Sequence, residues 1–118
     1  MVFVGISGCF SVLFGAWLAH AGQSLALPVQ MRLTSALQYQ FFHTIALLSV
    51  LIWAKHQTSK LLFIACLCFC LGILGFSGSL YLKTWLGIDA FSKAAPFGGT
   101  ILAIAWIFVA LAGKKLND

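Results

Sequence analysis

Residues 61–82 read LLFIACLCFCLGILGFSGSLYL, a run without a charged side chain. About 20 apolar residues are enough for one helix to cross the roughly 30 Å of hydrocarbon in a bilayer. Three other stretches have the same character, at residues 2–21, 37–54 and 95–113. The sequence therefore predicts an all-α membrane protein: one domain, residues 1–118, in which four transmembrane helices with short loops form a bundle.

The composition supports this class. Of the 118 residues 62% are hydrophobic and only 8% are charged, and the mean hydropathy is +1.04, which excludes an ordinary soluble domain. The seven basic and two acidic residues give a formal charge of +5 and lie in the predicted loops and the C-terminal tail. Basic residues in such places indicate contact with the lipid bilayer rather than with nucleic acid.

Two connections have a recognisable character. The segment 22–36 carries Pro28 and Arg32 but is too apolar for a free loop, so we expect it to lie in the membrane interface between the first two helices, as a short helix beginning at Pro28. Pro96 suits the first turn of the last helix.

Small residues follow one side of several predicted helices. Such residues let two helix backbones approach closely in a membrane. Those expected at helix contacts are Gly8, Gly15, Gly72, Gly75, Gly98 and Gly99.

Polar residues gather at those ends of the four stretches that meet on one side of the bilayer. His20 closes the first stretch, the segment 39–43 opens the second, and the segment 77–81 closes the third. If all four stretches span, these residues lie at one level. Buried polar groups cost several kcal/mol unless they find partners, so this layer is either a hydrogen-bonded structural element or the wall of a ligand-binding pocket.

Angular positions divide this layer. At 100° per residue Tyr39, Gln40 and His43 occupy about 100° of arc and share one face of the second helix. On the third helix Ser77 and Tyr81 lie within about 40° of each other, whereas Ser79 points nearly the opposite way. The candidate polar cluster therefore comprises His20, Tyr39, Gln40, His43, Ser77 and Tyr81.

Chemistry beyond hydrogen bonding has little support. The predicted spans contain no Asp, Glu, Lys or Arg, which disfavours ion-coupled transport, and the chain has no nucleophile motif or carboxylate pair. We therefore assign no catalytic residue and no enzymatic activity. Cys66 and Cys68 point about 200° apart on a helix, so the cysteines are expected to be buried free thiols, with no metal site and no cofactor.

The basic residues also bear on orientation. Four spans place Lys55, Lys60, Lys114 and Lys115 on the side of both termini, and Arg32, Lys83 and Lys93 on the other side. The positive-inside rule then favours cytoplasmic termini by one residue.

Four segments in order resemble one family: Gly15-Ala16-x-x-Ala19-His20, Tyr39-Gln40-x-x-His43, Phe76-Ser77-Gly78-Ser79-Leu80-Tyr81 and Pro96-x-Gly98-Gly99. They are similar to the domain-of-unknown-function 423 family, the YgdD-like small inner-membrane proteins, to which eukaryotic transmembrane protein 256 is related. The resemblance covers nearly the whole chain and implies a multi-span protein of the bacterial inner membrane. The sequence departs from the pattern at Trp17-Leu18, where phenylalanine and glycine are expected, and at Thr44, where alanine is usual.

Three functions remain open on the sequence. The first is a non-enzymatic membrane protein, an assembly, regulatory or lipid-organising factor, partnered by lipid and by a second copy or another membrane protein. The second is a small oligomeric transporter or channel with an outward-facing polar pocket. The third is a redox protein in which His20 and His43 hold a haem or metal.

Overall fold

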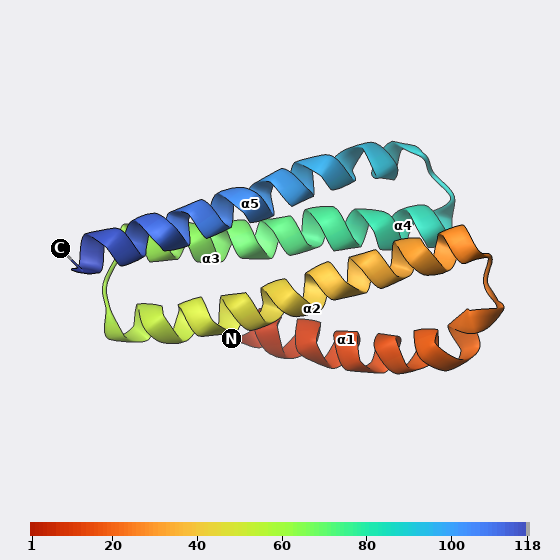
Figure 1. Ribbon diagram of the computed structural model, residues 1–118, viewed down its shortest axis with the longest axis horizontal. Helices are drawn as coiled ribbons and strands as arrows, with labels where there is room; N and C mark the ends of the chain where they lie inside the picture. Colours follow the sequence, from red (N-terminus) through yellow and green to blue (C-terminus); the bar gives the residue numbers. More distant parts are fainter. Residues whose placement is uncertain (118) are drawn as a thin grey trace.

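The computed structural model describes residues 1–117, apart from the side chains of residues 92, 116 and 117, and this part of the chain contains no strand. Four antiparallel rods lie side by side in a body of 52 × 27 × 19 Å (Figure 1). The first is α1 (Val2–His20), followed by a short 3-10 turn (Ala21–Ser24). The others are α2 (Leu27–His56), the continuous series of α3 (Lys60–Ile73), a π-helical turn (Leu74–Gly78) and α4 (Ser79–Leu86), and finally α5 (Ala90–Asn117).

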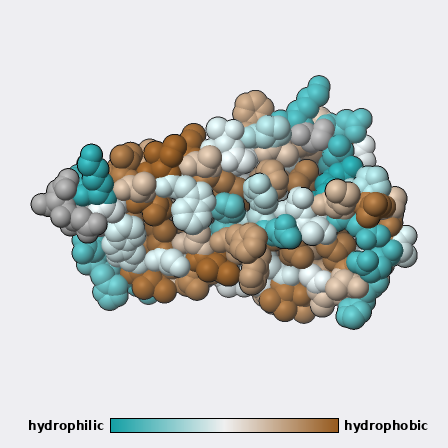
Figure 2. Space-filling view, viewed as in Figure 1, coloured by the Kyte–Doolittle hydropathy of each residue, from teal (hydrophilic) through white to brown (hydrophobic). Residues whose placement is uncertain are grey.

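Each rod is long and apolar enough to cross a membrane. The spans are Val2–Ser24, Leu27–His56, Lys60–Leu86 and Lys93–Lys115. Hydrophilic residues gather at the two ends of the molecule and hydrophobic residues cover most of the middle (Figure 2). The predicted all-α membrane bundle with four transmembrane helices is confirmed.

The second rod is longer than the sequence pattern suggested. The expected helix start beside Pro28 is correct, since Pro28 lies in the first turn of α2. That helix does not end before Leu37, however, because no glycine or proline interrupts residues 29–56. Residues 27–36 are thus the first turns of α2, a helix of 30 residues and about 45 Å.

The last rod also begins earlier than expected. α5 starts at Ala90, so Pro96 lies inside the helix and not in its first turn. Gly87 ends α4 with a φ of 68°, a left-handed conformation that glycine adopts without the strain a Cβ would cause. This tight cap leaves only two residues, Ile88 and Asp89, before α5.

Two apolar clusters hold the rods together. The larger lies between α2, α3 and α5 and is centred on the fully buried Phe69, Leu47 and Leu62. The smaller joins α1 to the first half of α2 through Phe14, Leu18 and Leu33. Because α1 has 19 residues and α2 has 30, α1 covers only part of its neighbour (Figure 1).

Glycines permit the closest crossing, between the π-helical turn and α5. A Cβ placed on Gly98 would lie 2.2 Å from the Phe76 backbone nitrogen, and one placed on Gly75 would lie 3.2 Å from the Gly98 Cα atom. A Cβ placed on Gly72 would likewise lie 2.5 Å from the Leu102 Cδ2 atom.

The glycines of α1 differ from each other. A Cβ on Gly15 would lie 3.3 Å from Leu37, whereas one on Gly8 would meet nothing within 4 Å. The expected helix contact at Gly8 is therefore absent from the described chain. The buried face of α1 instead follows Ser7, Ser11, Phe14 and Leu18, about 100° away around the helix.

Candidate functional site

Gln40 lies at the centre of the buried polar network and is only 6% exposed. Its amide nitrogen donates to the Ser7 hydroxyl at 3.0 Å and to the Ser7 carbonyl at 3.3 Å. Its carbonyl oxygen accepts a 2.7 Å hydrogen bond from the Tyr81 hydroxyl. One side chain of α2 thus connects α1 with α4.

Thr44 completes the network one turn further along α2. Its hydroxyl donates to the Gln40 backbone carbonyl at 2.5 Å and lies 2.7 Å from the Ser7 hydroxyl. A hydroxyl has one proton to donate, so Ser7 must be the donor in the Ser7–Thr44 bond. We call Ser7, Gln40, Thr44 and Tyr81 the polar cluster; its bonds run in one direction, from the Tyr81 hydroxyl to the Gln40 backbone.

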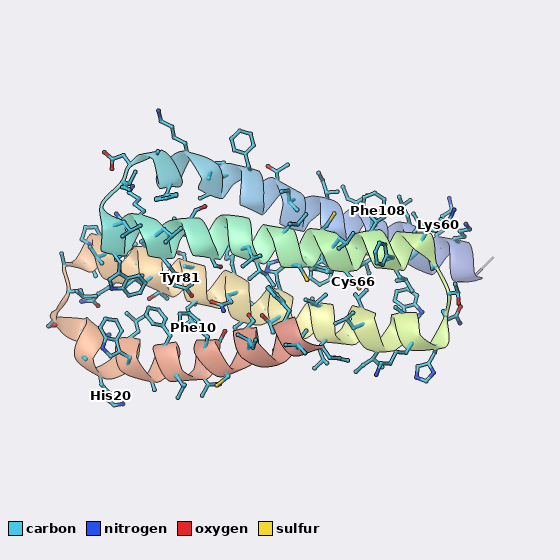
Figure 3. All side chains as sticks on the ribbon, turned by 180° about the vertical axis from the view of Figure 1, so that it is seen from behind. Phe10, His20, Lys60, Cys66, Tyr81 and Phe108 are labelled. Carbon is cyan, nitrogen blue, oxygen red and sulfur yellow. The ribbon has the colours of Figure 1, made fainter. Side chains whose placement is uncertain are left out.

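The polar cluster is satisfied within the protein. In the described part of the chain, no buried side-chain nitrogen or oxygen atom lacks a hydrogen-bond partner. The Tyr81 ring adds apolar contacts, with ring centroids 5.5 Å from Phe10 and 5.3 Å from Phe14. Phe10 and Tyr81 occupy the space between α1 and α4 (Figure 3).

The depth of this cluster differs from the sequence prediction. We expected residues 39–43 at the end of a span, but Gln40 lies near the middle of α2 because that helix begins ten residues before residue 37. Its partner Ser7 comes from the N-terminal half of α1 and not from the His20 end. The prediction that the polar residues of the second helix lie at the end of its span is therefore wrong for Gln40.

Tyr39 and His43 do not join Gln40. Tyr39 stacks on Phe76, with centroids 4.3 Å apart, and the His43 ring lies 6.0 Å from both Phe69 and Trp106. The His43 Nδ1 atom is 2.7 Å from the carbonyl of Tyr39 in its own helix. The predicted shared face is divided because its 100° arc straddles the boundary between two neighbours: α1 meets Gln40, and the α3–α5 side meets Tyr39 and His43.

His20 lies apart from the other candidates. It is the exposed last residue of α1 and points away from the bundle (Figure 3). His43 contacts α3 and α5 instead. The two imidazoles therefore do not converge, and the haem or metal site that they were considered for is not formed by this fold.

The serines of the third rod separate as their angles predict. Ser77 donates a 2.6 Å hydrogen bond to the Ala36 carbonyl on α2, the helix that Tyr81 also reaches through Gln40. Ser79 donates to the Gly75 carbonyl of its own rod. Because Ser77 lies in the π-helical turn, this turn is fixed to α2 by Ser77 and to α5 by the glycine contacts.

The cysteines do not form a site either. All four are free: Cys66 is buried, Cys68 and Cys70 are half-buried, and Cys9 is exposed on α1, contrary to the expected burial. Among the described residues no group of three metal-ligating side chains comes together.

A small open pocket lies beside the polar cluster. It has a volume of about 140 Å³, and Gln40, Ser77, Gly78 and Tyr81 contribute to its wall. This is below the range of roughly 300–1,000 Å³ that small-molecule sites occupy. The polar cluster offers no carboxylate, amine or imidazole, so proton transfer near neutral pH has no group to perform it there.

Ser7 and Thr44 were not among the predicted site residues. Their spacing gives little signal, because a serine or threonine inside an apolar helix often bonds only to its own backbone. Thr44 had one distinguishing feature, its departure from the family pattern of alanine. Only the pairing of α1 with the middle of α2 shows what its hydroxyl does.

Comparison with known proteins gives one family. Residues 14–99 match the family model described as Protein of unknown function (DUF423). The chain is 34% identical to a UPF0382 membrane protein of Haemophilus influenzae over 116 residues, covering 98% of this chain and 93% of the relative. It is 28% identical to the UPF0382 inner membrane protein YgdD of Escherichia coli over 118 residues, covering 99% and 90%. No solved structure matches significantly.

Proposed function

The chain belongs to the DUF423 family of membrane proteins, and from this premise we propose that it is a non-enzymatic membrane protein, an assembly, regulatory or lipid-organising factor. One observation carries the proposal: among the described residues, every buried side-chain nitrogen or oxygen atom has a hydrogen-bond partner within the protein, so no unpaired buried group marks a substrate site. The polar cluster then has a structural role. It fixes the register of α1, α2 and α4, which apolar packing alone specifies less sharply in lipid.

Because the buried polar groups have partners inside the bundle, we look for the partners of the protein on its outer surface. Lipid is the partner that this surface meets first. A second copy or another membrane protein is a further candidate partner. Gly5 is exposed and Gly8 is half-buried, and the open space beside both residues of α1 would allow its close approach.

The location follows from the relatives and the lysines. Since YgdD of Escherichia coli is named an inner membrane protein, we place this chain in the bacterial inner membrane. The count of basic residues, four on the side of the termini against three on the other side, favours cytoplasmic termini. A C-terminal reporter that is active only outside the cytoplasm would contradict this orientation.

A small transporter or channel is the second candidate, because the 140 Å³ pocket touches Gln40 and Tyr81. The two candidates differ in whether this pocket holds water connected to bulk solvent. One chain of four helices encloses too little volume for a pathway, so transport would require an oligomer.

Cysteine labelling separates the two. In a background with all four native cysteines replaced by alanine, Gly78→Cys places a thiol in the pocket wall, where a Cβ meets nothing within 4 Å and the polar cluster stays intact. We expect no reaction with a membrane-impermeant maleimide in membrane fragments that expose both faces of the bilayer to the reagent. Thr58→Cys, in the exposed turn between α2 and α3, is the positive control. Labelling of Gly78→Cys as fast as that of Thr58→Cys would support the transporter and reject the structural role.

A further inference from the structure

An apolar groove lies on the half of α2 that α1 does not cover. It has a volume of about 430 Å³ and runs between α2 and α3, beginning beside Met1 and Phe3 of the first rod. Its walls are apolar or thiol side chains such as Leu47, Leu51 and Cys66. Nothing in the polar cluster borders it, so it is a separate feature of the fold.

The length of the groove matches one half of a bilayer. From Leu47 on α2 to Gln57, the residue that follows the helix, its wall extends over ten residue steps, or about 15 Å at 1.5 Å per residue. The hydrocarbon of one leaflet is half of roughly 30 Å. A helix of a second copy would need about twice that length to span, whereas one acyl chain fits within it.

The end of the groove at the turn between α2 and α3 is polar. Gln57, Thr58 and Ser59 border it there, in the turn between α2 and α3. Ser59 accepts a hydrogen bond from the Leu62 amide and keeps its own hydroxyl proton for another acceptor. The first amides of α3 also point toward this turn, at the positive end of the helix.

Positive charge surrounds the same turn. Lys55 and Lys60 flank it and are exposed, and Figure 3 shows Lys60 at the outer end of the rod that carries Cys66. Lys114 and Lys115 end α5 at this end of the bundle (Figure 1). Of the two acidic residues, Asp89 lies in the connection at the opposite end and Asp118 lies outside the described residues.

The groove is apolar over the length of one leaflet and ends in a turn that is lined by hydroxyl groups and flanked by lysines. A phospholipid has the same order of parts, an apolar acyl chain followed by a charged headgroup. Basic pockets between transmembrane helices are known to bind anionic headgroups. We propose that this groove binds one acyl chain of an anionic phospholipid, with its phosphate at the turn formed by residues 55–60. This inference rests on the proposed function only in taking lipid as a partner of the outer surface, and it names the lipid class and the place.

Binding can be measured on the purified full chain by native mass spectrometry, with dioleoyl phosphatidylglycerol and dioleoyl phosphatidylcholine as the two probes. We expect the wild type to prefer phosphatidylglycerol. Each lysine near an anionic headgroup contributes about 1 kcal/mol, so Lys55→Gln with Lys60→Gln should weaken phosphatidylglycerol binding roughly 30-fold. Phosphatidylcholine binding should change little.

Lys83→Gln with Lys93→Gln is the matched control, because it removes the same charge from the other end of the bundle. It should leave the preference intact. Ala54→Phe fills the groove and should reduce the binding of both lipids; the lysine variants keep the test decisive even if this one does not fold.

Equal affinities for the two lipids, or equal losses in the two lysine pairs, would overturn the inference. A dimer that Ala54→Phe converts to a monomer would do so as well, since a second copy would then occupy the groove. The proposed function is tested separately. If Gly78→Cys is labelled and the protein still prefers phosphatidylglycerol, only the structural role is rejected. If Gly78→Cys is not labelled and the protein shows no lipid preference, only the lipid site is rejected.

Discussion

Replacing Gly98 by alanine tests the crossing between the π-helical turn and α5. The added Cβ would lie 2.2 Å from the Phe76 nitrogen, 2.5 Å from the Gly75 carbonyl carbon and 2.7 Å from the Phe76 Cα atom. Favourable contacts between carbon atoms need about 3.5–4.0 Å. All three atoms are backbone, so no side chain can rotate away, and α5 must shift outward by about 1 Å or more to restore that separation.

The magnitude follows from two opposing terms. Overpacking costs about 1–3 kcal/mol, and a clash with three backbone atoms, none of which can rotate away, belongs at the upper end. Alanine recovers about 1 kcal/mol of helix propensity relative to glycine. The net loss is about 2 kcal/mol, which for a domain of this size lowers the melting temperature by roughly 8 °C.

The assay is thermal unfolding of the purified protein in detergent, followed by circular dichroism. Gly99→Ala is the matched control, because its Cβ would lie 3.6 Å from the Phe76 ring, an ordinary contact, while the gain in helix propensity is the same. We expect Gly99→Ala to match or exceed the wild type. If Gly98→Ala proved as stable as Gly99→Ala, the close backbone crossing inferred from the structure would be refuted.

Three further experiments test other contacts by the same melting assay. Tyr81→Phe removes the donor to Gln40 and should cost about 1 kcal/mol; in a double-mutant cycle with Gln40→Leu the coupling should be near 0.6 kcal/mol, the average for hydrogen bonds between membrane helices, and zero coupling would contradict the Tyr81–Gln40 bond. Gly72→Ala should lower the melting temperature, because its Cβ would lie 2.5 Å from Leu102, whereas Gly8→Ala should not lower it, because the space around Gly8 is open; the reverse order would place the packed face of α1 elsewhere. His20→Gln should change stability by less than about 0.5 kcal/mol, as expected for an exposed side chain, and a larger loss would mean that His20 has a partner.

The sequence predicted the four helices correctly, but it predicted where they begin less well. The four spans follow from apolar length, which depends only on composition along the chain. The start of α2 was misplaced because Pro28 and Arg32 in an otherwise apolar segment suggested a separate interfacial piece, although nothing after Pro28 stops a helix. Pro96 likewise did not mark the start of the last helix, because α5 begins six residues before it, at Ala90.

Part of the candidate site could be predicted from the sequence. Gln40, Ser77 and Tyr81 were identified because polar side chains in apolar helices need partners. Their partners could not be predicted. Gln40 bonds to Ser7, 33 residues away, and Ser77 bonds to a backbone carbonyl, a group that every residue carries. His20 was included for its chemistry alone, and the fold leaves it outside.

The sequence by itself determined the class of this protein and its four membrane-crossing helices, because hydrophobic length is a local property of the chain. Only the tertiary structure decided that α1 pairs with the first half of α2. That register places Gln40 among Ser7, Thr44 and Tyr81, and it leaves a groove beside the lysine-flanked turn. The physical reason is that one turn of offset between two helices changes every partner along them, and this offset is fixed by packing and hydrogen bonds from residues far apart in the chain.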